Sequence, residues 1–397
     1  MNIPEEPDFT SAEFLDSHIR FILAFYEPNV KAPDGGFHQC FMDDGSVYNP
    51  EMRHLVSSTR FVYNYANAYR HTQKAHYAEW ALDGLNFLAR VHLQPAGHYA
   101  WIVEDGRLTD GRAMAYGHAF VMLAAASCMQ SELCDATKVL DSVWQFMEQH
   151  FWEEQGQAYA DERSADLAAL DAYRGQNANM HMCEALLAAY EATGNTRYLD
   201  RACTLAQRFA IDLAERNDGL IWEHYDSQWQ TDMQYNIDKP DDLFKPWGFQ
   251  PGHQVEWTKL LLQINEHRPQ QAWVDRAVSL FGSAMTYGWD EHYGGLVYGF
   301  APDKSFCDSH KYFWVQAEAF AAAWRLYRVT GQSEYLDNYK QLWRYSWNHL
   351  VDHEQGAWFR IRNRDGSAFD RLKSPPGKTD YHTMGACWDI LSQQAQA

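Results

Sequence analysis

The chain has 397 residues, of which 33 are Lys or Arg and 53 are Asp or Glu, so its formal net charge is −20 at pH 7. This acidic balance argues against binding to nucleic acid or to an anionic membrane surface, because both need a basic protein face. Apolar residues make up 46% of the chain, which is typical of a packed globular protein, and no run approaches the roughly 18 apolar residues of a membrane span.

The chain begins with the acidic segment MNIPEEPDFTSAEF, which lacks a basic-then-apolar signal, so we expect a cytoplasmic protein. The seven cysteines are odd in number and show no CxxC spacing, which argues against a disulfide framework or a zinc ribbon. Aromatic residues reach 15%. Aromatic walls with polar edges suit carbohydrate, but a thick aromatic core in a large helical domain explains the composition equally well.

Helical periodicity predicts twelve helices that alternate along the chain between an outer and an inner set. The outer helices are expected at residues 11–26, 78–93, 136–150, 196–215, 270–287 and 332–350. The inner helices are expected at residues 55–71, 115–130, 177–192, 253–266, 311–328 and 381–394.

A helix–helix corner recurs three times, at residues 68–72, 189–194 and 326–331, and a Tyr follows each corner at positions 77, 198 and 335. Each corner contains a Thr, and two of them end in a Gly that fits a left-handed helix cap. Such repetition indicates one supersecondary unit used several times. We therefore predict a single domain over residues 1–397, although length alone suggests two or three.

Three long links, 151–161, 289–300 and 353–362, place Gly between aromatic or β-branched residues and are interpreted as short hairpins over one mouth of the fold. Six helical hairpins that close into a ring predict an all-α fold, an (α/α)6 barrel whose inner helices line a cavity. An open solenoid of helical pairs is the alternative. We favour closure because the inner helices carry unusual polar residues, which need a shared pocket.

Two inner helices begin with the same His-x-x-Glu spacing, as His181 with Glu184 and His253 with Glu256. This spacing places the carboxylate one turn from the imidazole, where it can fix the tautomer of the ring. A satisfied core or surface pair is the alternative for either motif alone. A metal site is disfavoured because HExxH and its inverted form are both absent.

The other inner helices also carry polar or aromatic candidates near their starts: Arg60, Tyr116, His118, Trp314, Glu318 and His382. An Arg with apolar neighbours normally faces a ligand or a carboxylate, although a solvated Arg60 and a core-packed Trp314 are alternatives. The chain has no Gly-rich phosphate loop, no G-x-S-x-G elbow and no dinucleotide fingerprint. Several imidazoles without a nucleophile or a cofactor suit proton transfer at a carbon beside a carbonyl, as in isomerisation or epimerisation of an aldose.

Four stretches resemble the N-acylglucosamine 2-epimerase superfamily, and most closely its branch of aldose–ketose isomerases for mannose and sulfosugars. They are YRGQNANMHMCEALLAAYEATG (173–194), WEHYDSQW (222–229), PWGFQPGHQVEW (246–257) and DYHTMGACWDIL (380–391). The resemblance runs from Arg53 to Trp388 and implies an (α/α)6 barrel that uses no metal and no other cofactor.

Carried over by position, the resemblance implies that His253 and His382 are the acid/base histidines and that Glu256 orients His253. It implies that Arg60 binds the reacting oxygens. The residues expected to contact the sugar are His181, Asn177, Glu184, Tyr116, His118, Trp314, Glu318 and Trp388.

The resulting prediction is an isomerase that interconverts D-mannose and D-fructose, with D-lyxose and D-xylulose as further candidate substrates. Related sulfosugar enzymes are more basic where this chain has Asp241 and Asp242, so a neutral hexose is favoured. The alternatives are a 2-epimerase of the mannose, cellobiose or N-acylglucosamine type, a glycoside hydrolase or lyase, and a non-catalytic sugar-binding helical protein. We expect a monosaccharide as the partner, no nucleic acid or membrane, and a monomer or homodimer.

Overall fold

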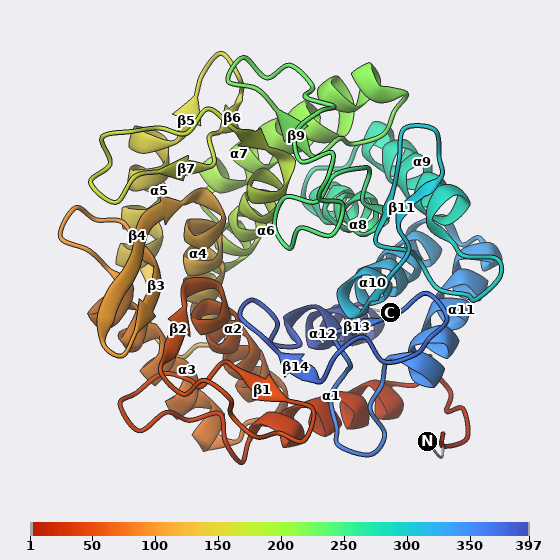
Figure 1. The fold of residues 1–397 in the computed structure, drawn as a ribbon, viewed down its shortest axis with the longest axis horizontal. Coiled ribbons are helices and arrows are strands. Elements are labelled where there is room, and N and C mark those ends of the chain that lie inside the picture. Colours follow the sequence, from red (N-terminus) through yellow and green to blue (C-terminus); the bar gives the residue numbers. More distant parts are fainter. Residues whose placement is uncertain (1–2, 396–397) are drawn as a thin grey trace.

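The computed structural model describes residues 3–395, whose helices form a closed ring of two layers (Figure 1). The inner layer contains α2 (Leu55–Thr72), α4 (Ala115–Gln130), α6 (Gln176–Thr193), α8 (Pro251–His267), α10 (Phe313–Thr330) and α12 (Tyr381–Ala395). The outer layer contains α1 (Ala12–Tyr26), α3 (Ala75–Phe87), α5 (Thr137–His150), α7 (Thr196–Ala206), α9 (Gln271–Gly288) and α11 (Ser333–His349). Each inner helix packs against the next, and α12 packs against α2, which closes the ring. The predicted (α/α)6 barrel is confirmed, and the open solenoid is wrong.

The inner helices α2, α4, α6, α8 and α10 each turn into the outer helix that follows, while α12 packs against α1 from the other end of the chain. At the repeated corners, Gln73, Gly194 and Gly331 take the left-handed conformation, with φ of 56°, 69° and 71°. Their N–H groups bond to carbonyls in the last turns of α2, α6 and α10, and the Tyr after each corner is buried. Two outer helices continue beyond their α-helical part, α3 as a π-helix over Leu88–His92 and α7 as a π-helix over Gln207–Leu213 followed by a 3₁₀ turn over Ala214–Asn217.

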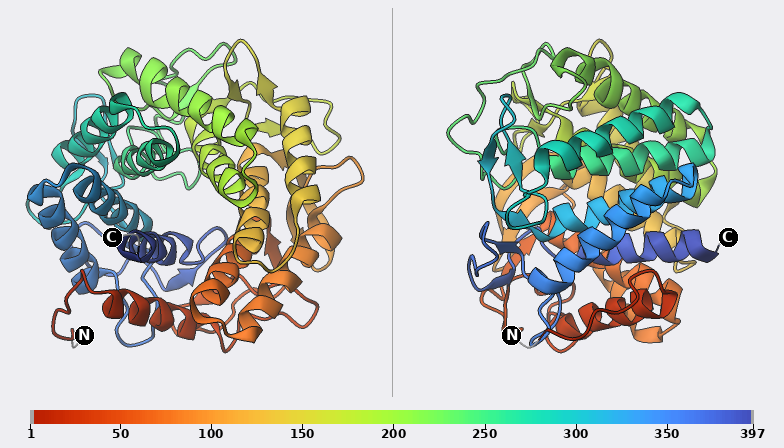
Figure 2. Two further views of the ribbon diagram at one scale, coloured as in Figure 1. Left: turned by 180° about the vertical axis from the view of Figure 1, so that it is seen from behind. Right: turned by 90° about the vertical axis from the view of Figure 1, so that its right-hand side faces the viewer.

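Short strands gather in the links at the end of the ring where the inner helices begin, as the side view in Figure 2 shows. An antiparallel sheet has the order β2 (Met52–His54), β3 (Ala100–Glu104), β4 (Arg107–Met114) and β7 (Glu162–Arg163). The two-stranded pairs are β1 (Phe41–Met42) with β14 (Leu372–Ser374), β5 (Trp152–Glu153) with β6 (Ala158–Tyr159), β8 (Arg174–Gly175) with β9 (His224–Tyr225), β10 (Gly299–Phe300) with β11 (Phe306–Asp308), and β12 (Lys311–Tyr312) with β13 (Ile361–Arg362). The predicted hairpin at 151–161 is β5–β6. Near the other two links, isolated bridges join Trp289 to Leu296 and Val351 to Trp358, and the last residues of these links form β10 and β13, which pair with β11 and β12.

The inner helices are buried on almost every side because they contact two inner neighbours and the outer layer. In α4, for example, every residue from Gly117 to Cys128 is buried. Within residues 3–395, no helix is long and apolar enough to cross a membrane. All seven cysteines are free thiols.

Candidate active site

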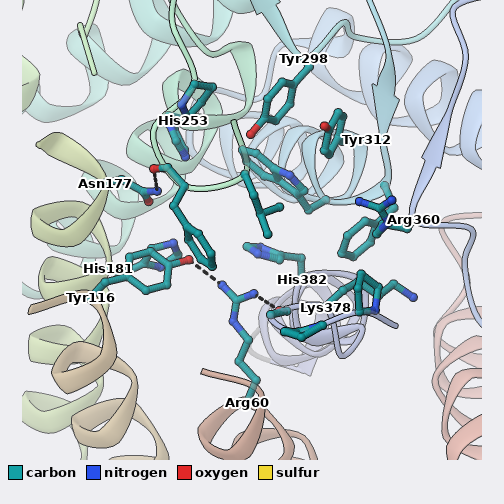
Figure 3. Close-up of a pocket in the computed structure, with 18 of the residues that line it drawn as sticks. Arg60, Tyr116, Asn177, His181, His253, Tyr298, Tyr312, Arg360, Lys378 and His382 are labelled. Atoms are coloured by element: carbon teal, nitrogen blue, oxygen red, sulfur yellow. Dashed lines mark hydrogen bonds between the residues drawn. The ribbon is translucent and has the colours of Figure 1, made fainter. Parts of the chain in front are cut away.

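A pocket opens between the starts of the inner helices, at the end of the ring that carries the strands (Figure 3). Side chains on a helix lean toward its N-terminus, so residues of the first two turns converge there. The inner helices contribute Arg60, Tyr116, Asn177, His181, His253, Glu256, Phe313, Trp314 and His382 to the lining. The links add Leu243, Phe244, Pro246, Tyr298, Tyr312, Arg360, Pro375, Pro376, Gly377 and Lys378.

His253 is held by Glu223, which lies in the link before β9. The Nδ1 atom of His253 is 2.9 Å from Oε2 of Glu223, and Nε2 of Gln176 donates to the same oxygen at 2.8 Å. Nε1 of Trp257 in turn donates to Oε1 of Gln176 at 2.8 Å. This buried chain fixes Nδ1 as the protonated nitrogen and leaves Nε2 as the basic one.

The expected pair of His253 with Glu256 is therefore wrong. Glu256 instead faces His382, with its Oε1 atom 3.7 Å from Nδ1 of that ring. Glu223 lies inside one of the stretches that carry the family resemblance, but no spacing rule links it to a histidine thirty positions later on another element.

His382 is held by Glu318. Its Nδ1 atom is 2.7 Å from Oε1 of Glu318, whose Oε2 accepts a hydrogen bond from Nζ of Lys259 at 2.5 Å. Burial, together with the nearby Arg60 guanidinium, lowers the pKa of His382 well below its usual 6.5. The ring is thus neutral at physiological pH and able to accept a proton.

His181 forms the predicted pair with Glu184, with 3.0 Å between Nδ1 and Oε2. The other oxygen of Glu184 accepts a hydrogen bond from the Tyr381 hydroxyl. Burial alone raises the pKa of Glu184, but the hydrogen bond from His181 and the charge of Lys259 outweigh it and bring this pKa to about 2. All three pocket histidines therefore share one design, a carboxylate at Nδ1 and a second nitrogen left for the pocket.

Glu256 lines the pocket in surroundings that favour its protonated form. Burial and the neighbouring Glu318 raise its pKa well above 4.5. Its Oε2 atom has no hydrogen-bond partner within residues 3–395, which makes it available to a ligand. Side-chain atoms of Glu256, Glu318 and His382 lie within 4.8 Å of one another, close enough to hold a cation. Because the Lys259 ammonium already binds Glu318 and supplies positive charge there, we assign no metal to this cluster.

Arg60 is 6% exposed, so the solvated alternative is wrong. Its guanidinium donates to the carbonyl of Gly377 at 2.5 Å and to the Tyr116 hydroxyl at 3.0 Å, as the dashed lines in Figure 3 show. It also lies over the rings of Phe120 and Tyr381, 4.4 and 4.8 Å from their centres. No carboxylate in the described chain forms a salt bridge with Arg60, so its positive charge remains available to a ligand.

Trp314 contacts both candidate acid/base histidines. Its ring centre is 5.2 Å from that of His253 and 5.6 Å from that of His382. The indole packs so closely on Gly252 that a Cβ atom there would lie 2.4 Å from it. Trp314 thus forms a wall of the pocket rather than part of the core alone.

Four predicted residues do not line the pocket. His118 is fully buried, with Nδ1 bonded to the Met114 carbonyl and Nε2 accepting from the Tyr99 N–H, so its role is structural. Trp388 lines a second cavity at the opposite end of the ring. Glu184 and Glu318 also lie outside the pocket wall, and act on it only through the histidines they bind.

Comparisons with known proteins identify the family of this chain. The family model of N-acylglucosamine 2-epimerase (GlcNAc 2-epimerase) matches residues 35–386. A D-mannose isomerase of Marinomonas mediterranea is 49% identical over 97% of this chain and 98% of its own length. A crystal structure of D-mannose isomerase matches with a TM-score of 0.96 at 48% identity, covering 98% of this chain and 100% of that one. Cellobiose 2-epimerase from Spirochaeta thermophila shares the fold, with a TM-score of 0.86 at 21% identity over 97% of this chain and 96% of that one. The chain belongs to the N-acylglucosamine 2-epimerase family and is an isomerase.

Proposed function

We propose that this member of the N-acylglucosamine 2-epimerase family interconverts D-mannose and D-fructose. The proposal depends on one observation. The same pocket holds a neutral His382 bound to a carboxylate and an Arg60 that, within residues 3–395, forms no salt bridge with a carboxylate. A neutral imidazole can remove a proton from carbon, and an uncompensated guanidinium can stabilise the oxygen charge that results. The relatives named D-mannose isomerase support the choice of sugar.

In the proposed reaction, His253 first assists ring opening by moving a proton between the ring oxygen and O1. His382 then removes the C2 proton of the open-chain aldose, and the electron pair of that bond forms the C1–C2 double bond. Negative charge develops on O1, where Arg60 stabilises it. A proton passes from O2 to O1, and His382 returns its proton to C1, which gives the ketose.

Glu256 is suited to the transfer between O2 and O1. A neutral carboxylic acid can donate a proton from one oxygen while it accepts another at its second oxygen, and the Oε2 atom of Glu256 has no partner in the described structure. The proposed sugar contacts are His181, Asn177, Tyr116 and Trp314.

A neutral sugar is favoured over a phosphorylated or sulfonated one. Two further bases line the pocket, but Arg360 pairs with Asp370 and Lys378 pairs with Asp380. The segment that includes Asp241 and Asp242 presents Leu243 and Phe244 to the pocket instead of its acids. An added anionic group would therefore meet bases that are already neutralised, together with apolar side chains.

The experiment is proton NMR of D-mannose incubated with the enzyme in D₂O, well before equilibrium. Because one imidazole serves both carbons, we expect fructose as the first product, with deuterium in a single stereochemical position at C1 and some hydrogen transferred directly. Early appearance of glucose labelled at C2, with fructose lagging, would instead identify a 2-epimerase in which His253 protonates C2 from the opposite face.

We also propose that the reaction needs no metal, that residues 1–397 form one catalytic domain, and that the enzyme works in the cytoplasm as a monomer or homodimer. The Lys259 ammonium, which already supplies positive charge beside His382, supports metal independence. The seven free thiols suit a reducing compartment. Full activity after exhaustive chelation is expected, and light scattering measures the oligomeric state. Activity that is lost on chelation and restored by one divalent ion would contradict the first of these proposals.

A further inference from the structure

We propose that Lys259 is a positioning residue for this reaction, which acts on His382 through Glu318 from the side opposite the sugar. The inference rests on the proposed role of His382 as the base. Lys259, Glu318 and His382 come from three inner helices, α8, α10 and α12. They form a continuous buried line, in which Nζ of Lys259 is 2.5 Å from Oε2 of Glu318 and Oε1 of Glu318 is 2.7 Å from Nδ1 of His382.

The position of Lys259 is unusual for a lysine. Its residue surface is 8% exposed, and a buried ammonium is retained only where carboxylates compensate its loss of water. Burial alone lowers the pKa of Lys259, but the charges of Glu318 and Glu184 outweigh it and raise this pKa well above 10.5. Lys259 therefore remains an ammonium throughout the pH range in which the enzyme works.

The charged and titratable groups around the line come from five inner helices. They are Arg60 and Tyr63 from α2, His181 and Glu184 from α6, Glu256 from α8, Glu318 from α10, and Tyr381 and His382 from α12. Three of these groups are carboxyls within a small volume. Without a cation among them, a carboxyl or an imidazole would have to take up an extra proton to limit their repulsion.

Burial raises the pKa of Glu318, and the charge and hydrogen bond of Lys259 oppose this rise, so the ammonium favours the ionised carboxylate. In that form, one oxygen of Glu318 accepts from the ammonium and the other from His382. An ionised Glu318 can only accept hydrogen bonds, so His382 must donate from Nδ1 and present a basic Nε2 to the sugar. A protonated Glu318 could donate to Nδ1 instead, which would place the wrong tautomer in the pocket.

Lys259 is also reachable from outside without passing the sugar pocket. A cavity of about 650 Å³ opens at the other end of the ring, lined by the C-terminal halves of the inner helices. Lys259 is one of its lining residues, together with Glu184, Glu318, Tyr63 and Trp388. A small cation can therefore enter behind the catalytic histidines, which makes chemical rescue of a shortened side chain feasible.

The test compares Lys259→Met, which removes the charge but keeps the volume, with Lys259→Ala, which leaves space for an added amine. We expect kcat for mannose to fall about 10–100-fold in both, with little change in KM, as for other groups that orient a histidine. The acid limb of the kcat/KM profile should move to higher pH, by about one to three units, because a cluster without the ammonium holds a proton more tightly. Propylammonium at constant ionic strength should restore part of the activity of Lys259→Ala, saturably, whereas 1-propanol should not.

The matched control is Lys373→Met. Lys373 is also buried and paired with a carboxylate, that of Asp352, but it lies outside the pocket. This variant should lose stability without a shift of the pH profile and without rescue by amines. Lys259→Arg keeps a positive charge, so its kcat/KM profile should keep the wild-type acid limb. If Lys259→Met and Lys259→Ala do not fold, the pH profile of Lys259→Arg tests the role of the charge.

A second readout does not depend on the sugar. The imidazole ¹⁵N signals of His382, assigned with His382→Gln, are titrated in the free enzyme, and their midpoint should rise in Lys259→Met. If the wild type proves inactive on mannose, this titration still decides the role of Lys259, so the two proposals fail separately. Reduced activity with an unchanged pH profile, an unchanged His382 titration and no response to propylammonium would show a merely structural role and overturn the inference.

Discussion

The replacement Glu223→Gln tests whether the carboxylate found next to His253, rather than Glu256, positions that ring. The wild-type oxygen Oε2 accepts hydrogen bonds from His253 at 2.9 Å and from Gln176 at 2.8 Å. The amide is isosteric, so its oxygen can still accept from both donors, but its charge is gone. A hydrogen bond to a charged group contributes about 1.5–3 kcal/mol and a neutral one about 0.5–1.5 kcal/mol. The expected loss is thus about 1–2 kcal/mol, which corresponds to a roughly 5–30-fold lower kcat.

The assay is the initial rate of fructose formation from mannose, measured together with circular dichroism to verify folding. Glu191→Gln is the matched control, because it removes the carboxylate from another histidine pair, with His267, at 3.0 Å and far from the pocket. This control should have the wild-type rate. A wild-type kcat for Glu223→Gln in a folded protein would refute the assignment of Glu223 as the partner that orients His253.

The remaining predictions concern the other histidines, the pocket wall and the dependence of stability on pH. His382→Ala should abolish turnover with an intact circular dichroism spectrum, whereas His181→Ala should mainly raise KM; near-normal turnover of the former would contradict its role as the base. Gly252→Ala should lower kcat, because its new Cβ would lie 2.4 Å from the Trp314 indole between the two catalytic histidines. The control is Gly282→Ala on the outer helix α9, where no atom lies within 4 Å of the new Cβ. This variant should keep the wild-type rate and gain about 0.5–1 kcal/mol of stability. Burial lowers the pKa of His118 to about 4, so between pH 6.5 and 4 the unfolded chain binds a proton at this residue that the folded chain does not. The free energy of unfolding, measured with urea, should therefore fall as the pH is lowered through that range. It should fall less steeply in His118→Gln, which lacks this proton-binding group.

The sequence was sufficient to predict the ring, since twelve periodic segments and a repeated corner leave few other ways to bury the apolar faces of so many helices. The sequence also indicated that the pocket lies at the starts of the inner helices, because the polar and aromatic candidates occur there. The sequence-based prediction failed for residues whose access to the pocket depends on their angle around a helix or on their distance along it. His118 lies two residues after Tyr116, about 200° around the helix, so both cannot face the axis. Trp388 lies six residues after His382, about 9 Å further along α12, and therefore reaches the opposite cavity.

Glu223 and Lys259 could not have been predicted from local spacing. Glu223 meets its histidine from a link, and Lys259 meets Glu318 across two helices that are 59 positions apart at these residues. These long-range contacts depend on the closure of the ring, because closure determines which faces of neighbouring helices and links pack against each other. Hydrophobic periodicity identifies the buried faces but not the polar side chain that a neighbouring helix will present.

The common direction of the six inner helices has an electrostatic consequence. Each helix carries a macrodipole equivalent to roughly half a positive charge at its N-terminus. All six N-termini surround the pocket, so the backbone alone places a positive potential there, in a protein whose formal net charge is −20. A neutral sugar gains little from this field. The negative charge that appears on its oxygens when the C2 proton leaves is attracted by the whole ring, so the scaffold itself favours the enediolate over the bound substrate.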